Sequence, residues 1–332
     1  MTEIGKYPQP ILAIRCLTYN HGKYIRQCLE GFVMQKTTFP FIAIVHDDAS
    51  TDNTAEIIRE YEKKYPDIIK PIYETENQYS KPDGALNRIM SQAVPEGVKY
   101  IALCEGDDYW TDPFKLQKQV DFITQNPSCG LVFTIARYFS QKDNRFTRYF
   151  GESIHTINDF INKGNTIPTL TVLYKKSIAE QYFTEIQPEK RNWLMGDLPM
   201  WLYFAHNSGI GFIPECTGVY RVLQNSASHY QSKSEQLKFQ LNGLQIIKFF
   251  TEKYAINNDV LDINLAWFKF EYLALVHDKS GIKDLHEHIK DLRNKYKSLK
   301  LIIIQLTYRF PYMFITALQF YRKIKCCFKL SK

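Results

Sequence analysis

The sequence lacks the long apolar runs of an export signal or of a helix that spans a membrane. Its first ten residues, MTEIGKYPQP, have no apolar signal region, so we expect no export. Residues 301–306 are apolar apart from Gln305, but Arg309 and Pro311 interrupt the run soon afterwards. A spanning helix needs about 20 predominantly apolar residues. The sequence therefore predicts neither a secreted nor an integral membrane protein.

Cysteine patterns of structural metal sites and disulfide frameworks are also lacking. The seven cysteines are odd in number, none has metal-type spacing, and Cys326 and Cys327 are adjacent. This usage is typical of reduced thiols, so we expect a cytoplasmic protein. No nucleophilic triad, internal repeat or low-complexity linker is recognisable.

A net excess of positive charge is lacking outside one segment. The net charge is +7, yet residues 290–332 contain eleven Lys or Arg against the single acid Asp291. The rest of the chain is thus slightly acidic. This local imbalance argues against general nucleic-acid binding, and we expect no nucleic-acid partner.

What the sequence does contain is a core-forming composition and an alternation of strand and helix signals. Hydrophobic residues make up 45% and aromatic residues 14%, enough for one large domain with an appendage or for two domains. Expected strands lie at 11–17, 41–45, 69–73, 99–104, 131–135, 170–174, 211–214 and 218–222. Helical patterns follow most of the early strands, which predicts an α/β fold with a mostly parallel sheet. From about residue 234 the pattern is helical, so we divide the chain into 1–233 and a C-terminal helical region, 234–332.

Polar clusters follow three of these strands. They are Thr18 to Gly22, Asp47 to Asp52, and Glu105 to Asp108. Since ligands bind at the carboxyl ends of strands in such sheets, we expect a site at this edge. For Ser50 and Asp52 a helix-capping role is the simpler interpretation, whereas Asp47 and Asp48 favour ligand contact.

The segment Glu105-Gly106-Asp107-Asp108 is the strongest constellation. Three carboxylates within four residues repel one another unless a cation joins them, and Mg²⁺ or Mn²⁺ prefers oxygen ligands and bridges diphosphates. A solvated turn that caps the next helix is the alternative, but Asp112-Pro113 is better placed for that cap.

Three motifs together resemble the family 2 glycosyltransferases of the GT-A fold. They are the runs Leu17 to Asn20, His46 to Thr54, and Glu105 to Trp110, whose order and spacing match as well as their residue types. The resemblance covers about residues 10–230 and leaves out the C-terminal helices. It implies a GT-A fold, a mostly parallel sheet flanked by helices, with a C-terminal helical extension.

The resemblance also implies roles for individual residues. Thr18, Tyr19 and Asn20 would line the nucleotide pocket, and Asp48, with Asp47, would read the base, commonly uracil. Asp107 would bind the metal, Mn²⁺ or Mg²⁺. Glu105 replaces the more usual first Asp of the DxD motif and would face ribose or metal, while Asp108 would orient the loop or a donor hydroxyl.

Two later segments complete the implied site. Asp197, in Met195 to Leu202, would be the catalytic base, because inversion at a sugar carbon needs a carboxylate to take the proton of the acceptor hydroxyl. It also suits the N-cap of the following helix. Arg221 would brace the fold or approach phosphate. His229 would complete the metal shell or touch the diphosphate, although Leu223 stands where many relatives place a histidine.

The sequence thus predicts an inverting, metal-dependent glycosyltransferase. Its donor would be a nucleotide-diphosphate sugar, with UDP favoured, and its acceptor a glycan or a lipid-linked molecule in cell-surface polysaccharide biosynthesis. A nucleotidyltransferase is one alternative, disfavoured because residues 18–22 lack a Gly-rich, Arg-containing loop; a non-catalytic binding protein on the same fold is another.

The basic C-terminal segment has two interpretations. Aromatics flanked by Lys and Arg over 299–328 suit an interfacial helix on anionic lipid, which would place the protein peripherally at the inner face of the cell membrane. A pair of core-packing helices with a basic exposed face fits nearly as well.

Overall fold

A computed structural model describes residues 9–81, 84–223 and 232–318. Their contacts divide into two units. Among the described residues, those up to 192 and residues 200–223 form the first unit, and residues 193–199 and 232–318 form the second. Each unit has its own core.

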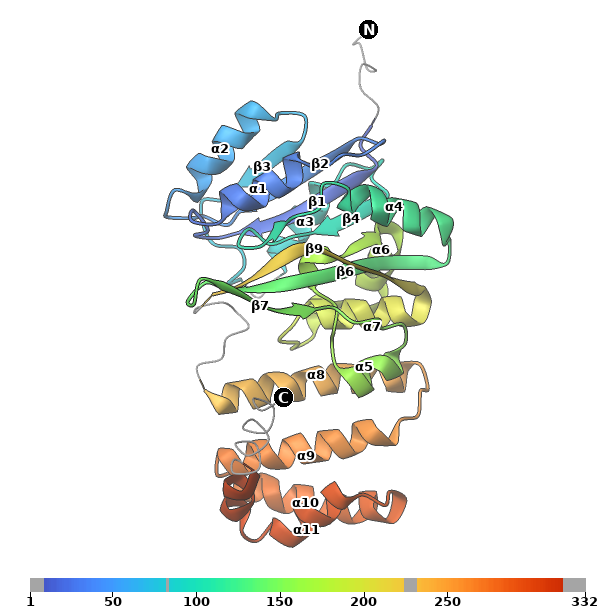
Figure 1. The fold of residues 1–332 in the computed structure, drawn as a ribbon. Coiled ribbons are helices and arrows are strands. Elements are labelled where there is room, and N and C mark those ends of the chain that lie inside the picture. The colour runs from blue at the N-terminus through green and yellow to red at the C-terminus, as the bar shows by residue number, and fades with distance from the viewer. Residues whose placement is uncertain (1–8, 82–83, 224–231, 319–332) are drawn as a thin grey trace. The chain divides into compact units, whose positions relative to one another are not determined.

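The first unit is built on a nine-stranded mixed sheet (Figure 1). Its strands are β1 (Leu12–Thr18), β2 (Phe41–Asp47), β3 (Ile69–Tyr73), β4 (Tyr100–Leu103), β5 (Tyr109–Trp110), β6 (Cys129–Ser140), β7 (Arg145–Phe150), β8 (Leu173–Lys175) and β9 (Gly209–Val222). The order is β3-β2-β1-β4-β8-β6-β9-β5, with β7 on β6. β1 to β4 pair in parallel, and β8 joins β4 to β6 antiparallel to both.

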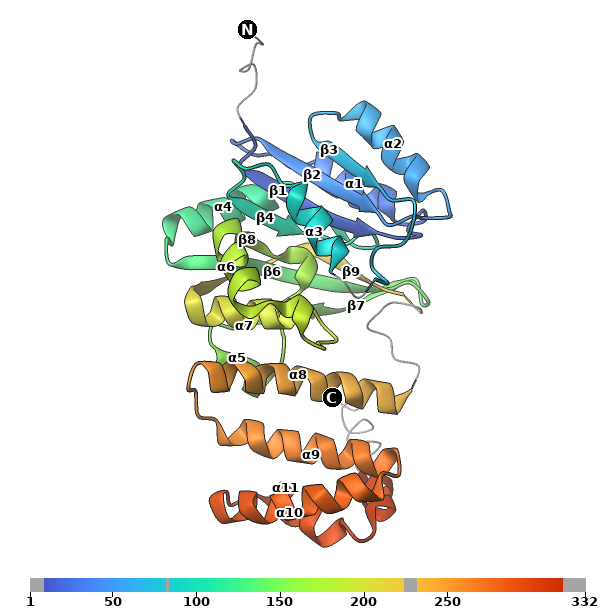
Figure 2. The same cartoon turned by 180° about the vertical axis from the view of Figure 1, so that it is seen from behind.

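Helices cover both faces of this sheet, as expected for parallel strands linked by crossovers. The helices are α1 (Ile25–Val33), α2 (Thr54–Lys64), α3 (Ala85–Gln92), α4 (Lys115–Gln125), α5 (Ile157–Lys163), α6 (Lys176–Ile186) and α7 (Asp197–Asn207). Apolar side chains of α1, α2 and α4 pack with alternate residues of β1 and β2 in one core. Figure 2 shows α3 and α6 on the opposite face. The sheet flanked by helices that the sequence predicted is confirmed.

Local differences from the sequence-based prediction have physical causes. Residues 209–222 form one strand, β9, instead of two short ones, because they pair along nearly their whole length with β6. The expected strand at 170–174 begins with a 3₁₀ turn, Thr169–Thr171, and only Leu173–Lys175 pairs. Helix α4 begins at Lys115, and Asp112 instead accepts a hydrogen bond from the Phe114 amide at 2.8 Å.

The second unit is helical. It contains α8 (Lys233–Lys253), α9 (Asp259–Leu275), α10 (Lys279–Lys295) and α11 (Leu299–Thr307), followed by helical residues 311–318. Capping side chains of Ser232, Asn258 and Asp278 fix the starts of the first three helices. Among the described residues, no helix is long and apolar enough to cross a membrane.

Candidate active site

The loops after β1, β2 and β4 come together at the carboxyl edge of the sheet. In the parallel register Thr18 pairs with Asp47, so the two strands end side by side. The Asp48 amide donates to the Thr18 carbonyl at 2.9 Å, and the Gly106 amide donates to the Leu17 carbonyl at 2.9 Å. These backbone bonds hold the three polar clusters of the sequence at one place.

Asn20 links the first two loops. Its φ is +54°, a left-handed conformation that Asn tolerates better than most residues. Its amide donates to the Ser50 hydroxyl at 2.9 Å, and its side-chain oxygen accepts from the Thr51 amide at 2.8 Å. Tyr19, beside it, keeps 46% of its surface exposed, so its ring is available to a ligand.

Gly106 is required by a close approach. A Cβ at this position would lie 2.6 Å from the Thr18 hydroxyl and 3.0 Å from Nδ1 of His21. Cβ atoms essentially never lie closer than 3.0 Å to atoms of other residues, so the contact with Thr18 would force a shift. Glycine therefore allows the loop of residues 105–108, which we call the acidic loop, to lie directly on the end of β1.

Three polar atoms around this contact are buried and have no hydrogen-bond partner within the described part of the chain. They are Oγ1 of Thr18, Nδ1 of His21 and Oδ1 of Asp47. Burial lowers the pKa of His21, while the nearby carboxylates of Asp107, Asp52 and Asp47 act in the opposite direction. Buried polar atoms normally find partners, so this cluster suits a polar ligand. The sequence analysis did not select His21, although its place within the Thr18 to Gly22 cluster was a usable signal.

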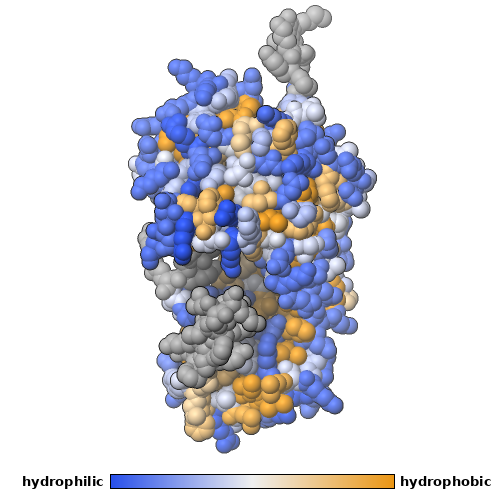
Figure 3. Space-filling model, in the orientation of Figure 1, coloured by the Kyte–Doolittle hydropathy of each residue, from blue (hydrophilic) through white to orange (hydrophobic). Residues whose placement is uncertain are grey.

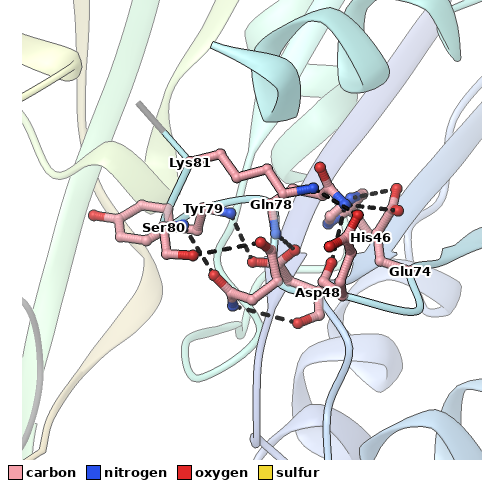
Figure 4. Close-up of polar contacts among 9 residues, drawn as sticks. His46, Asp48, Glu74, Gln78, Tyr79, Ser80 and Lys81 are labelled. Atoms are coloured by element: carbon pink, nitrogen blue, oxygen red, sulfur yellow. Dashed lines mark hydrogen bonds and ion pairs between the residues drawn. The ribbon is translucent and has the colours of Figure 1, made fainter. Parts of the chain in front are cut away.

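Asp48 is buried and holds the loop that follows β3. Its two carboxylate oxygens accept from the amides of Gln78 at 2.6 Å and Tyr79 at 3.0 Å (Figure 4). The same loop is tied to β2 through His46, whose Nε2 lies 3.3 Å from Glu74. Tyr79 is 72% exposed, so the loop that Asp48 holds also carries an exposed aromatic side chain.

The carboxylates of the acidic loop differ in how deeply they are buried. Glu105 and Asp107 are half-buried, whereas Asp108 is only 2% exposed. Burial, together with the neighbouring charges of Asp107 and Glu105, raises the pKa of Asp108 well above its usual range. Asp108 is therefore an internal carboxyl, and Asp107 and Glu105 are the ones that a cation can reach.

Arg221 braces this loop from β9. Its amide donates to Oδ1 of Asp108 at 2.7 Å, and its Nε donates to the Asp107 carbonyl at 2.7 Å. Its guanidinium also donates to Gln27 at 2.7 Å and lies 5.0 Å from the ring centroids of Tyr24 and Tyr109. Of the two roles considered for Arg221 in the sequence, these contacts correspond to the bracing one.

The carboxylates at this edge have oxygen ligands of the kind that a divalent cation prefers. Within residues 9–81, 84–223 and 232–318, no three His, Cys, Asp or Glu side chains form a ready-made metal cluster. Mg²⁺ is usually held by one or two carboxylates together with substrate phosphates, and Asp107 and Glu105 supply such a pair.

Asp197 belongs to the second unit. It is the first residue of α7, is half-buried, and its Oδ1 accepts from the Leu198 amide at 2.7 Å. The helix dipole favours a carboxylate at this position. His229, the predicted additional metal ligand, lies outside the described residues.

Comparison with known proteins adds to this geometry. The model of the family described as glycosyl transferase family 2 matches residues 16–183, which include all three loops of the sheet edge. The chain belongs to this family. The family 2 match confirms the resemblance seen in the sequence.

Individual relatives of this family 2 chain share about a third of its residues or fewer in the matched regions. An uncharacterised protein of Mycobacterium tuberculosis, Rv1520, is 34% identical over 63% of this chain, and the match spans 58% of that relative's length. The putative teichuronic acid biosynthesis glycosyltransferase TuaG of Bacillus subtilis is 28% identical over 68% of this chain and 84% of its own. The fold is similar to that of S. aureus TarS 1-349 in complex with UDP-GlcNAc, with a TM-score of 0.57, 17% identity and coverage of 85% and 81% of the two chains.

Proposed function

We propose that the chain is an inverting glycosyltransferase of cell-surface polysaccharide biosynthesis. It would transfer a sugar from a nucleotide-diphosphate donor, with UDP favoured, to a hydroxyl of a glycan or lipid-linked acceptor. The observation that carries the proposal is the sheet edge, where half-buried Asp107 and Glu105 accompany the unpartnered polar atoms of Thr18 and Asp47. The name of TuaG supports the polysaccharide context.

In this proposal the donor binds across the first unit. Thr18, Tyr19 and Asn20 line the nucleotide pocket, and Asp48 and Asp47 face the base. Asp107, with Glu105, holds Mn²⁺ or Mg²⁺, which would neutralise the charge of the departing diphosphate. Arg221 and Asp108 keep that loop in place.

The chemical step would be one displacement. The Asp197 carboxylate takes the proton of the acceptor hydroxyl, whose oxygen forms a bond to the anomeric carbon as the bond from that carbon to the diphosphate oxygen breaks. The nucleoside diphosphate leaves, and the sugar carbon is inverted. We place the enzyme in the cytoplasm, with peripheral association at the inner membrane face through its basic C-terminal segment.

A panel of nucleotide sugars incubated with Mn²⁺ tests this proposal through release of nucleoside diphosphate. Asp107→Asn should weaken Mn²⁺-dependent nucleotide binding, whereas Asp197→Asn should keep binding and lower turnover by about 10²–10⁴-fold, the contribution of a general base. Binding without turnover of any donor would favour a non-catalytic protein. Formation of a sugar nucleotide from a nucleoside triphosphate and a sugar phosphate would favour a nucleotidyltransferase.

A further inference from the structure

The last helices of the second unit expose apolar side chains in an unusual concentration. In α11, Leu301 and Ile304 are buried at 0% and 1% exposure, yet Leu299, Ile302 and Leu306 are exposed at 72%, 37% and 74%. These three share one side of the helix by their i, i+3, i+7 spacing. A helix that is apolar on both its buried and its outward side needs a second apolar environment.

The chain extends this surface beyond α11. Phe310, Tyr312 and Met313 are exposed at 63%, 53% and 69%. We call the six residues the apolar face; they are Leu299, Ile302, Leu306, Phe310, Tyr312 and Met313. Figure 3 shows apolar side chains gathered on this part of the helical unit. Contiguous exposed apolar patches mark sites of interaction with proteins or membranes.

A pocket of about 450 Å³ adjoins the apolar face, and three of the six residues line it. Its other lining residues include Lys279, Lys283 and Arg309, and none is Asp or Glu. The pocket thus combines apolar walls with cations, which is the complement of an anionic amphiphile.

The C-terminal sequence around the apolar face is also positively charged. From Arg293 to the last residue there are ten Lys or Arg and no acid. A second copy of this chain would bring like charges together across a symmetric interface. A bilayer containing anionic lipid instead offers apolar chains and negative headgroups at the same surface.

We propose that the apolar face and its cation-lined pocket dock the helical unit onto a bilayer of anionic phospholipid. The side chains of Leu306 and Phe310 enter the boundary between headgroups and acyl chains, and Lys279, Lys283 and Arg309 contact headgroup phosphates. This inference deepens the membrane association within the proposed function and is independent of its chemistry. It assigns the contact to described residues instead of to residues 319–332.

Co-sedimentation of the full chain with vesicles tests the docking. Binding is expected to vesicles of phosphatidylcholine mixed with phosphatidylglycerol and to be far weaker with phosphatidylcholine alone. The double variant Leu306→Glu/Phe310→Glu should lower the bound-to-free ratio by about tenfold or more, since it removes two large apolar side chains from the contact. Val260→Glu is the matched control, because Val260 is 46% exposed on α9 and absent from the pocket.

Charge is tested separately with Lys279→Gln and Lys283→Gln. Each should weaken binding to anionic vesicles roughly fivefold, the equivalent of about 1 kcal/mol per cation near such a surface. Equal binding to neutral vesicles, or unchanged binding by the double variant, overturns the proposal. So does a dimer in light scattering that dissociates in the double variant while lipid binding is absent.

Two further measurements distinguish a failure of the docking proposal from an unfolded variant and from a failure of the transferase proposal. Thermal unfolding by circular dichroism establishes that each variant is folded. Donor hydrolysis without any lipid should be unchanged in all of them, so a loss of docking leaves the proposed chemistry untouched, and an inactive but lipid-binding protein contradicts only the transferase proposal.

Discussion

The Arg221 amide donates a 2.7 Å hydrogen bond to the buried carboxyl of Asp108, across 113 positions of sequence. Strand β9 thereby holds the acidic loop through backbone and side chain together, because Nε of Arg221 also bonds the carbonyl of Asp107. The backbone of Asp107, whose side chain is half-buried, is thus bonded directly to β9.

Replacing the Arg221 side chain should loosen that loop. Arg221→Ala keeps the amide bond to Asp108 but removes the bonds to Asp107 and Gln27, so we expect a loss of about 1–3 kcal/mol in the free energy of unfolding. Mn²⁺-dependent nucleotide affinity, measured by calorimetry, should fall as well. Arg148→Ala, on the exposed strand β7, is the control. Unchanged affinity in a folded Arg221→Ala protein would contradict the bracing role.

Adding one methyl group at Gly106 should disturb the site strongly. In Gly106→Ala the new carbon meets Thr18 and His21 at 2.6–3.0 Å, so the loop must shift at a cost of about 1–3 kcal/mol. We expect donor turnover to fall by about 10²-fold, because a shift of about 1 Å in the groups that position the substrate has an effect of that size. Gly97→Ala is the matched control, because its nearest neighbour would lie at 3.9 Å. Similar losses in both variants would argue against the close approach as the cause.

The Asp48 carboxylate should be needed for the loop after β3. In Asp48→Asn only one oxygen remains to accept from the amides of Gln78 and Tyr79, and the new NH₂ group faces the other donor. A buried donor left without its acceptor costs about 1–3 kcal/mol. Hydrogen exchange at both amides should accelerate, and UDP affinity should weaken. Asp67→Asn, at an exposed position, should change neither; protection of both amides in Asp48→Asn would refute the expectation.

Because Lys115 is buried, we expect the free energy of unfolding to depend on pH. It is fully buried, with Nζ 2.7 Å from Gln119 Oε1, and burial lowers its pKa from 10.5 to about 7. Between these values the unfolded chain binds more protons than the folded one, so the free energy of unfolding rises with pH from about 7 to 10.5. Below about pH 7 the buried lysine is charged, and the full cost of burying that charge lowers the stability.

The contribution of Lys115 to this slope is at most about 1.4 kcal/mol per pH unit. Urea unfolding at several pH values should show a flatter rise in Lys115→Met than in the native chain. Lys118→Met on the same helix is the control, since its ion pairs with Asp112 and Glu215 raise the pKa of that lysine. If stability rises equally with pH in Lys115→Met and in the native chain, Lys115 is not the cause of the rise.

Much of the site's position could be predicted because strands and their ends have local signals. Apolar runs such as 41–45 mark buried strands, and the polar residues after them must lie at the sheet edge. That local rule placed Thr18, Asp47 and Glu105 correctly at one edge. It did not reveal β7, whose exposed residues, Arg145–Phe150, lack the apolar alternation of a half-buried strand.

The roles of Asp107 and Asp108 differ for a reason that no local pattern contains. The two carboxylates are adjacent and chemically alike, yet one is half-buried and the other almost fully buried. The buried one, Asp108, accepts a hydrogen bond from the Arg221 amide of β9, a strand far away in the sequence.

The alternation of strands and helices, and with it the edge at which the carboxylates gather, follows from local residue patterns, because hydrophobic periodicity acts within a few residues. The packing of the folded chain settles three further features. It settles which carboxyl is buried, that β8 inserts antiparallel between β4 and β6, and that α11 remains apolar on its outward side. These features depend on the register and packing of segments far apart in the chain, and such contacts leave no periodic trace in the residues that make them.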